Sequence, residues 1–258
     1  MNQRTSWDYT DLARFYLYRP DYADTAIDEL LRVTDSRPGA RCCDVGAGTA
    51  HLTLKLCERR LLVDAIEPNA AMREIGKERT QGLNGVSWFD GIAEDTGRGK
   101  GEFALVTFGS SFNVTDRPVA LCHAHHILAD DGWFACLWNH RDLEDPIQFR
   151  IEEIIRTKVP HYAYGHRRED QTSVIAASGR FGPVVRIEAS VAYDQPVESY
   201  IAAWRSHATL RRQAGDRFAS IISDIATFVR SLSTATIRVP YTTRVWAAPR
   251  CDFRESSP

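Results

Sequence analysis

Short apolar runs alternate with helical patterns between residues 41 and 140. The apolar runs, each about the length of a buried strand, lie at Arg41–Val45, 61–66, Val86–Phe89, 103–108 and 133–138. Segments 49–60 and 117–128 carry apolar residues at helical spacing. A run that is apolar at nearly every position, such as 103–108, is typical of a parallel strand covered by helices on both faces. The pattern therefore predicts an α/β fold with a mostly parallel sheet.

The pattern changes after residue 145. Helical spacing predicts a helix from four isoleucines, Ile147, Ile151, Ile154 and Ile155. An aromatic and basic stretch follows at 160–168, and we expect residues 145–180 to form a lid insertion after the fifth strand. Strand patterns return at 184–191 and 236–247, with helical patterns between them at 197–206 and 217–232. We expect these late strands to join the same sheet.

A glycine-rich turn follows the first predicted strand, with the sequence Asp44-Val45-Gly46-Ala47-Gly48-Thr49-Ala50. A strand, a glycine turn and a helix in this order form a nucleotide-binding crevice. Asp44 would repel the pyrophosphate of a dinucleotide, and His51 occupies the place of the third glycine in the dinucleotide fingerprint. An acid at this position instead favours a cationic ligand such as S-adenosylmethionine.

With these features the turn resembles the first motif of class I S-adenosylmethionine-dependent methyltransferases that act on small molecules. Two further segments carry the resemblance. Tyr16-Leu17-Tyr18-Arg19-Pro20-Asp21-Tyr22 is similar to the family's N-terminal Tyr-x-x-Arg-Pro-x-Tyr motif, and Glu67-Pro68-Asn69-Ala70-Ala71-Met72 is similar to the helix after its second strand. The sequence departs from the family at Ala50, which is usually glycine, and at 128–133, where a different sequence keeps the turn.

The resemblance covers most of the chain and implies a fold. That fold is a Rossmann-like, seven-stranded, mostly parallel sheet with helices on both faces. It forms a single domain over residues 1–258. Within that domain, residues 1–38 are expected to form an N-terminal helical cap and residues 145–180 the lid insertion.

The cofactor site is expected around the glycine turn. Glu67 ends the second strand at the distance from the turn where dinucleotide folds place their ribose acid. Its two carboxylate oxygens suit the two ribose hydroxyls. The resemblance implies the remaining contacts with S-adenosylmethionine: Gly46, Ala47 and Gly48 in the turn, Pro68 beside Glu67, Ala93 and Glu94 at the adenine, Ser110 and Phe112 at the sulfonium, and Tyr18 and Arg19 at the methionine carboxylate. Asp90 competes with Glu94 for the adenine role, and the Phe112 ring would face the cationic sulfur.

The acceptor is expected at the end of the fifth strand, because strand carboxyl ends line the crevice in open α/β sheets. Asn139 and His140 lie there, and Tyr162 follows in the insertion. With their basic neighbours they suit a polar small molecule, including a carboxylated one. His140 or His161 would serve as a base near neutral pH, and the sequence does not select between them. The stretch 204–207 is a second candidate wall.

Composition narrows the partners. The formal net charge is −2 and the pI about 6.5, so neither nucleic acid nor an anionic membrane is expected as a partner. No apolar run approaches the roughly 20 residues that span a bilayer, and the N-terminus lacks a signal-peptide core. The six cysteines lack zinc spacing and the histidines at 123–126 lack an acidic partner, so no metal is expected. We expect a cytoplasmic monomer or homodimer.

The favoured function is methyl transfer from S-adenosylmethionine to a small-molecule acceptor in biosynthesis, including secondary metabolism. Some members of the family instead cyclise the cofactor's aminobutyrate arm and release methylthioadenosine and azetidine-2-carboxylate. The aromatic N-terminus and insertion suit this reaction too. A non-catalytic S-adenosylmethionine-binding module is a third alternative, and the intact acids and glycines disfavour it. A nicotinamide-dependent reductase is disfavoured by Asp44 and His51.

Overall fold

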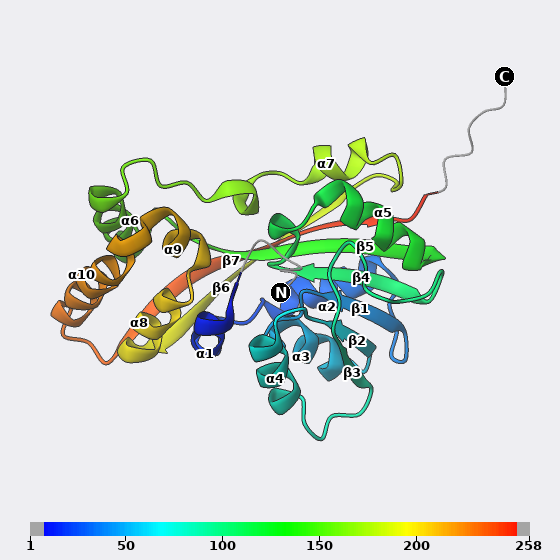
Figure 1. The fold of residues 1–258 in the computed structure, drawn as a ribbon, viewed down its shortest axis with the longest axis horizontal. Coiled ribbons are helices and arrows are strands. Elements are labelled where there is room, and N and C mark those ends of the chain that lie inside the picture. The colour runs from blue at the N-terminus through cyan, green and yellow to red at the C-terminus, as the bar shows by residue number, and fades with distance from the viewer. Residues whose placement is uncertain (1–7, 252–258) are drawn as a thin grey trace.

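One seven-stranded sheet forms the centre of the molecule in a computed structural model that describes residues 8–251. The strand order is β3-β2-β1-β4-β5-β7-β6. Strands β1 to β5 pair in parallel, whereas β7 runs antiparallel to both β5 and β6. Helices lie on both faces of the sheet (Figure 1). This is the Rossmann-like sheet expected from the sequence.

The strands follow the apolar runs closely. They are β1 (Arg41–Val45), β2 (Leu62–Ile66), β3 (Val86–Phe89), β4 (Phe103–Gly109), β5 (Leu128–Arg141), β6 (Val185–Pro196) and β7 (Thr236–Pro249). Strand β5 begins five residues earlier than expected. The turn foreseen near Gly132 is an irregularity in the pairing of β5 with β4, where the register shifts between Phe103 and Leu105.

The helices are α1 (Ala13–Tyr16), α2 (Asp24–Val33), α3 (His51–Glu58), α4 (Ala70–Arg79), α5 (Arg117–Ile127), α6 (Pro146–Lys158), α7 (Thr172–Ala177), α8 (Val197–Arg205), α9 (Ala208–Ala214) and α10 (Phe218–Ser231). Side-chain caps fix the starts of several of them. The Asn69 side chain accepts from the Met72 amide at the start of α4, and Asp116 accepts from the Val119 amide at the start of α5. Pro68 therefore precedes the cap of α4 instead of lying in its first turn.

Two apolar layers hold these helices against the sheet. Helices α2 and α3 cover one face, where Ile27, Leu30 and Leu56 are fully buried. Helices α5 and α7 cover the other face, where three phenylalanine rings, Phe108, Phe112 and Phe134, pack at centroid distances of 5.4–5.5 Å. Burial of such side chains contributes about 1.5–3 kcal/mol each. The carboxyl ends of β1, β2 and β4 are thereby held in fixed positions.

A separate helical lobe lies beyond the parallel part of the sheet. Helices α6, α8, α9 and α10 gather there around the extended ends of β5, β6 and β7 (Figure 1). Their core includes Ile151, Tyr200 and Ile225, each fully buried. Because β5 to β7 run through both regions, the lobe is joined to the sheet by continuous strands.

Residues 145–180 do not form one separate insertion. Helix α6 belongs to the helical lobe, and Ile175 of α7 is buried in the apolar layer beside α5. The stretch 160–168 connects them and contains the short 3-10 helix η3 (Gly165–Arg168). Whether this connection moves as a lid remains a prediction. Among residues 8–251, no helix combines the length and the apolar character needed to cross a bilayer.

Candidate functional site

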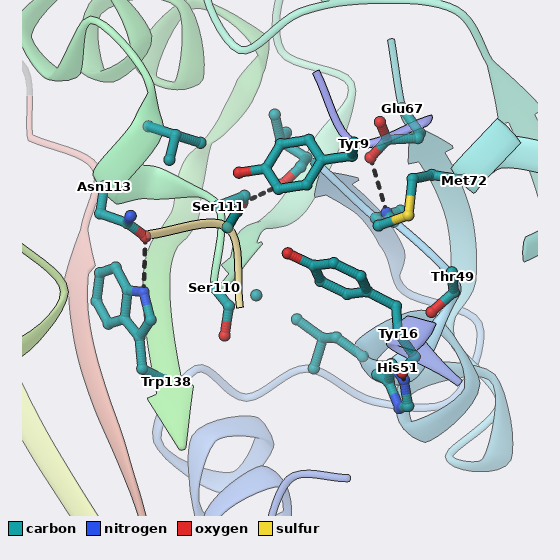
Figure 2. A pocket seen from close by; sticks show the side chains of 18 of the residues that line it. Tyr9, Tyr16, Thr49, His51, Glu67, Met72, Ser110, Ser111, Asn113 and Trp138 are labelled. Atoms are coloured by element: carbon teal, nitrogen blue, oxygen red, sulfur yellow. Dashed lines mark hydrogen bonds between the residues drawn. The ribbon is translucent and has the colours of Figure 1, made fainter. Parts of the chain in front are cut away.

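A cavity of about 620 Å³ lies at the carboxyl ends of the parallel strands, within the usual range for ligand pockets. Its walls come from the turns after β1, β2 and β4, the end of β5, and the N-terminal segment, which we define as residues 8–22. In Figure 2 the rings of Tyr9 and Tyr16 lie between Glu67 and Met72 on one side and Ser110 and Asn113 on the other. The N-terminal segment thus crosses the cavity.

The glycine turn is built around close backbone contacts. Gly46 and Gly48 both have positive φ, and a Cβ on Gly46 would meet the Ser111 Cβ at 2.4 Å. The Gly46 and Ala47 amides donate to the Ile66 carbonyl at 2.8 and 3.0 Å. Ser111 Oγ donates to the Val45 carbonyl at 2.6 Å. Only glycine fits at position 46, because any side chain would displace the turn that follows β4.

Asp44 is fully buried at the end of β1 and also lines the cavity. Its carboxylate accepts from Thr53 Oγ1 at 2.7 Å and from Thr107 Oγ1 at 3.1 Å. Burial raises the pKa of Asp44 to about 6, against the lowering effect of these hydroxyls. No cation lies within 4.0 Å of this carboxylate among residues 8–251. The protein therefore holds a buried acid at the cavity wall without a basic partner.

Glu67 follows β2 and is only 6% exposed. Its two oxygens accept from the Gly48 amide at 2.9 Å and the Asn69 amide at 2.8 Å. Burial raises the pKa of Glu67 to about 7, although both backbone amides lower it. Each oxygen retains a lone pair for a further donor. The geometry suits two adjacent hydroxyl groups of a ligand.

The turn after β3 supplies the far end of this half of the cavity. Ala93 and Glu94 both line it, and Glu94 accepts from the Asp116 amide at 2.7 Å. Asp90, the competing candidate for the adenine contact, lies outside the lining and has Arg73 at 3.7 Å. The geometry thus favours Glu94 over Asp90.

The turn after β4 differs from the expectation at Phe112. Ser110 lines the cavity with a positive φ of 58° and shares a hydrogen bond of 2.9 Å with the Tyr22 hydroxyl. Phe112 instead turns inward and packs against Phe108 and Phe134, fully buried. Placing Phe112 at the sulfonium was wrong, because the apolar layer beneath the sheet takes the ring. Tyr22, with its hydroxyl in the cavity wall, lies where Phe112 was expected.

The N-terminal segment supplies Tyr9, Tyr16, Arg19 and Pro20 to the lining. Arg19 stacks on Tyr16 at 4.0 Å and donates to Ser206 Oγ and its carbonyl, both at 2.8 Å. Tyr18 was expected beside Arg19, but its side chain is exposed and lies outside the lining. The short helix α1 turns Tyr16 toward the cavity and Tyr18 away from it.

His51 and Asn139 anchor this segment. His51 contacts Asp21 Oδ1 at 2.6 Å through Nδ1 and the Tyr16 carbonyl at 2.8 Å through Nε2. The Asn139 amide donates to the Asp21 carbonyl at 2.7 Å and accepts from Thr243 at 2.5 Å. Asn139 lines the cavity, but its polar atoms are engaged in positioning the chain. His51, which stands where the dinucleotide fingerprint has its third glycine, therefore holds the N-terminal segment in place.

Two acceptor-side candidates lie away from the cavity. His140 is 3% exposed and its Nε2 donates to the Arg167 carbonyl at 2.8 Å. Burial lowers the pKa of His140 to about 4, which makes it a weak base at neutral pH. Tyr162 is buried in the core of the helical lobe. Side chains alternate along β5, so His140 and its neighbours Asn139 and Arg141 point to opposite sides of the strand.

The other wall of the cavity is formed by four residues, namely Arg141, Arg167, His207 and Tyr241. Arg141 lies over the Trp204 ring at 4.0 Å and donates to His207 Nε2 at 3.1 Å. The sequence predicts Arg141, with Asn139 and His140, as an acceptor-side candidate and the stretch 204–207 as a second candidate wall, but it gives no sign of Tyr241. That residue reaches the site because β7 returns beside β5, with Tyr241 paired opposite Arg141. Among residues 8–251, no group of three or more metal-ligating side chains is present.

Comparison with known proteins shows that part of this chain is similar to methyltransferases. Residues 42–132, from β1 into β5, match the model of a methyltransferase domain. An uncharacterized methyltransferase of Mycobacterium tuberculosis is 30% identical over 124 residues, 48% of either chain. Demethylmenaquinone methyltransferase of Staphylococcus epidermidis is 31% identical over 103 residues, 38% of this chain and 43% of that one. The matches thus span about half the length of the curated relatives.

Residues 42–132 are about a third of the chain, and over this part the chain is similar to a methyltransferase domain. The matched residues contain Asp44, the glycine turn, Glu67 and Glu94. The helical lobe lies outside the match. The likeness to methyltransferases therefore concerns the half of the cavity that the parallel strands build.

Solved structures of methyltransferases share the fold over most of the chain. A geranyl diphosphate C-methyltransferase of Streptomyces coelicolor has a TM-score of 0.53 at 15% identity, covering 96% of this chain and 100% of that one. A phosphoethanolamine N-methyltransferase of Haemonchus contortus has a TM-score of 0.56 at 14% identity, covering 96% and 59%. At these identities the likeness concerns the fold alone.

Proposed function

We propose that the protein binds S-adenosylmethionine in this cavity and transfers its methyl group to a small-molecule acceptor. The observation that carries the proposal is the pair of buried acids on either side of the glycine turn. Among residues 8–251, neither the Asp44 nor the Glu67 carboxylate is in an ion pair, although Arg73 donates to the Glu67 backbone carbonyl. Both acids therefore remain available to a cationic ligand with free ribose hydroxyls. Asp44, at the turn over which a pyrophosphate would lie, would repel an anionic dinucleotide.

The residues of the cavity suit each part of the cofactor. Glu67 would accept from the ribose hydroxyls, Ala93 and Glu94 would border the adenine, and Gly46 and Gly48 leave room for the backbone to approach the ligand. S-adenosylmethionine, when bound, supplies a methyl group on an already activated sulfonium. The chain's own contribution is then mainly alignment and exclusion of water, and the rings of Tyr9 and Tyr16 close the cavity for this purpose.

A small acceptor fits the enclosed site. The N-terminal segment and the helical lobe leave a cavity, not an open groove for a polymer. Relatives are named for small molecules: a demethylmenaquinone, geranyl diphosphate and phosphoethanolamine. A role in small-molecule biosynthesis, including secondary metabolism, follows from this proposal. We also propose that the whole chain acts as one methyltransferase domain in the cytoplasm.

Calorimetric titration tests the cofactor half of the proposal. S-adenosylmethionine and S-adenosylhomocysteine should each bind with a stoichiometry of one, whereas NAD⁺ should give no binding heat. Binding of NAD⁺ in preference to S-adenosylmethionine, or no binding of S-adenosylmethionine, would overturn the assignment.

A further inference from the structure

The cavity is electrically polarised. Four acids line the half built by the turns after β1 to β4: Asp44, Glu67, Glu94 and Asp116. Three arginines line the opposite half, which is built by the N-terminal segment, the end of β5 and the 3-10 helix η3: Arg19, Arg141 and Arg167. We call these three residues the arginine cluster. In the strand order, the acids lie at the ends of β1 to β4 or in the turns that follow them, whereas Arg141 lies at the end of β5.

No carboxylate neutralises the arginine cluster. Among residues 8–251, no Asp or Glu oxygen lies within 4.0 Å of a guanidinium nitrogen of Arg19, Arg141 or Arg167. Glu152 on α6 accepts from the Tyr164 hydroxyl and has Arg156 at 4.0 Å. Surface arginines of this chain, such as Arg37 and Arg230, do pair with acids. Among residues 8–251, some other arginines without a carboxylate partner, such as Arg14 and Arg60, are exposed to solvent, whereas the arginine cluster lines the cavity.

Arg167 is the least satisfied member of the cluster. Its Nε atom is buried and has no hydrogen-bond partner within residues 8–251, and its guanidinium lies 5.5 Å from the centroid of the Tyr164 ring. Burial and the neighbouring arginines lower the pKa of Arg167 to about 10, which leaves it cationic at neutral pH. The backbone holds it in place, because its carbonyl accepts from His140 and the adjacent Arg168 donates to the Arg141 carbonyl at 2.9 Å.

His207 adds a second unsatisfied donor. Its Nε2 accepts from Arg141 at 3.1 Å, so the ring proton of the neutral form must reside on Nδ1. Burial and the arginines lower the pKa of His207 well below its usual value, which keeps the ring neutral. The residue is only 4% exposed, and Nδ1 has no partner among the described residues. A buried N–H without an acceptor costs about 1–3 kcal/mol.

We propose that Arg141, Arg167 and His207 bind an anionic group, a carboxylate or a phosphate, on the methyl acceptor, while Arg19 stays assigned to the methionine carboxylate of the cofactor. This inference rests on the proposed function and names the substrate class of the same site. All the unsatisfied groups described here are donors, and a carboxylate or phosphate supplies only acceptors. Arg141 and Arg167 would hold the anion, and His140 is a positioning residue because its ring fixes the Arg167 backbone.

The polarity also orients the reaction. A cationic sulfonium is attracted to the acidic half, and an anionic acceptor is attracted to the basic half. The turn at Gly109 and Ser110, at the end of the central strand β4, lies between the two halves. The acceptor's nucleophilic atom would therefore meet the methyl group near Ser110, with its anionic end directed toward Arg167.

The test uses the intact protein saturated with S-adenosylhomocysteine and three probes of one shape. Benzoate and phenyl phosphate carry the anion, and benzamide is the uncharged control. Calorimetry should detect binding of at least one anion and none of benzamide. The better of the two anions identifies carboxylate or phosphate as the group. Absence of binding by both anions, or equal binding of benzamide, would overturn the proposal.

Two variants separate this role from a structural one. Arg167→Met should lower the affinity for the preferred anion at least tenfold, and Arg167→Lys should retain part of it. Arg37→Met removes one exposed arginine and should leave the affinity unchanged. Because Arg167 is an uncompensated charge, Arg167→Met should also raise the melting temperature of the ligand-free protein. A lower melting temperature together with unchanged anion affinity would show that Arg167 only supports the fold.

A third readout separates this proposal from the cofactor assignment. The affinity for S-adenosylmethionine, measured without added anions, should be the same in the wild type and in Arg167→Met. A tenfold loss would show that Arg167 holds the methionine carboxylate of the cofactor, which would overturn the acceptor role and leave the proposed function intact. No binding of S-adenosylmethionine by the wild type would overturn the proposed function, whatever the anions do.

Discussion

At the scale of single residues, Asp44 and Glu67 are two buried acids on either side of the glycine turn. Their type and spacing from the glycine turn were sufficient to predict both as cofactor contacts. The structure places both in the cavity wall, with the pKa of each raised by burial. Phe112 and Tyr18 were misplaced, because their direction depends on the apolar layer and on helix α1. Sequence spacing does not determine which way a side chain points after a turn.

The first prediction concerns these acids. Asp44→Asn and Glu67→Ala should each weaken S-adenosylmethionine binding at least tenfold, about 1.4 kcal/mol, because each removes a carboxylate from the cofactor half. Glu74→Ala changes an exposed acid on α4 and is the matched control. Calorimetry measures all three. Unchanged affinity in both site variants would contradict the assignment.

The second prediction is a pH dependence of cofactor binding. The pKa of Glu67 is about 7 without ligand, above its ordinary value, so its proton is bound more tightly in the fold than in the unfolded chain. Ribose hydroxyls need the ionised form, so affinity should rise with pH and fall roughly tenfold from pH 8 to pH 6. Calorimetry in two buffers of different ionisation enthalpy should show proton release near pH 6.5. A flat profile would contradict the role of Glu67.

The third prediction concerns Ala50, which replaces the usual glycine of the motif and has a φ of 71°. Ala50→Gly relieves this left-handed strain, whereas Ala26→Gly in helix α2 relieves none. Ala26→Gly should cost about 1 kcal/mol in free energy of unfolding, and Ala50→Gly should cost less or stabilise the fold. Denaturant titration compares the two. An equal loss in both would show that no strain resides at position 50.

At the scale of elements, the parallel strands were the most predictable part. A run such as that at 103–108 is nearly all apolar, because helices cover both faces, and its period leaves no ambiguity. The segments around the site were harder. Short helices such as α1 and α7 carry too few residues for a clear pattern, and the path of residues 160–171 is set by tertiary contacts such as that between His140 and Arg167.

The fourth prediction concerns the two segments beside the cavity. The N-terminal segment and residues 160–168 should both exchange amide hydrogen more slowly when S-adenosylhomocysteine is bound. His51→Ala removes the contacts to Asp21 and Tyr16, so it should speed exchange in the N-terminal segment and leave 160–168 unchanged. Hydrogen exchange that is equally slow with and without ligand at 160–168 would contradict the lid predicted there.

At the scale of the molecule, the segment that matches a methyltransferase domain builds one half of the cavity, and the rest of the chain builds the other half. The acidic half lies within the matched residues 42–132. The basic half depends on the extension of β5 and β7 into the helical lobe. This extension pairs Tyr241 with Arg141, and η3 lies against the same end of β5. These contacts join residues 27 to 100 positions apart, so local patterns could not predict the arginine cluster as a unit.

Our central proposal is that this cavity binds S-adenosylmethionine and that the methyl group is transferred to a second molecule. The most direct measurement is to incubate the pure protein with S-adenosylmethionine alone and analyse bound and free products by mass spectrometry. We predict that one intact cofactor is bound per chain and that methylthioadenosine does not exceed the level in a no-protein control. Methylthioadenosine together with azetidine-2-carboxylate would contradict it and make cyclisation of the cofactor the reaction.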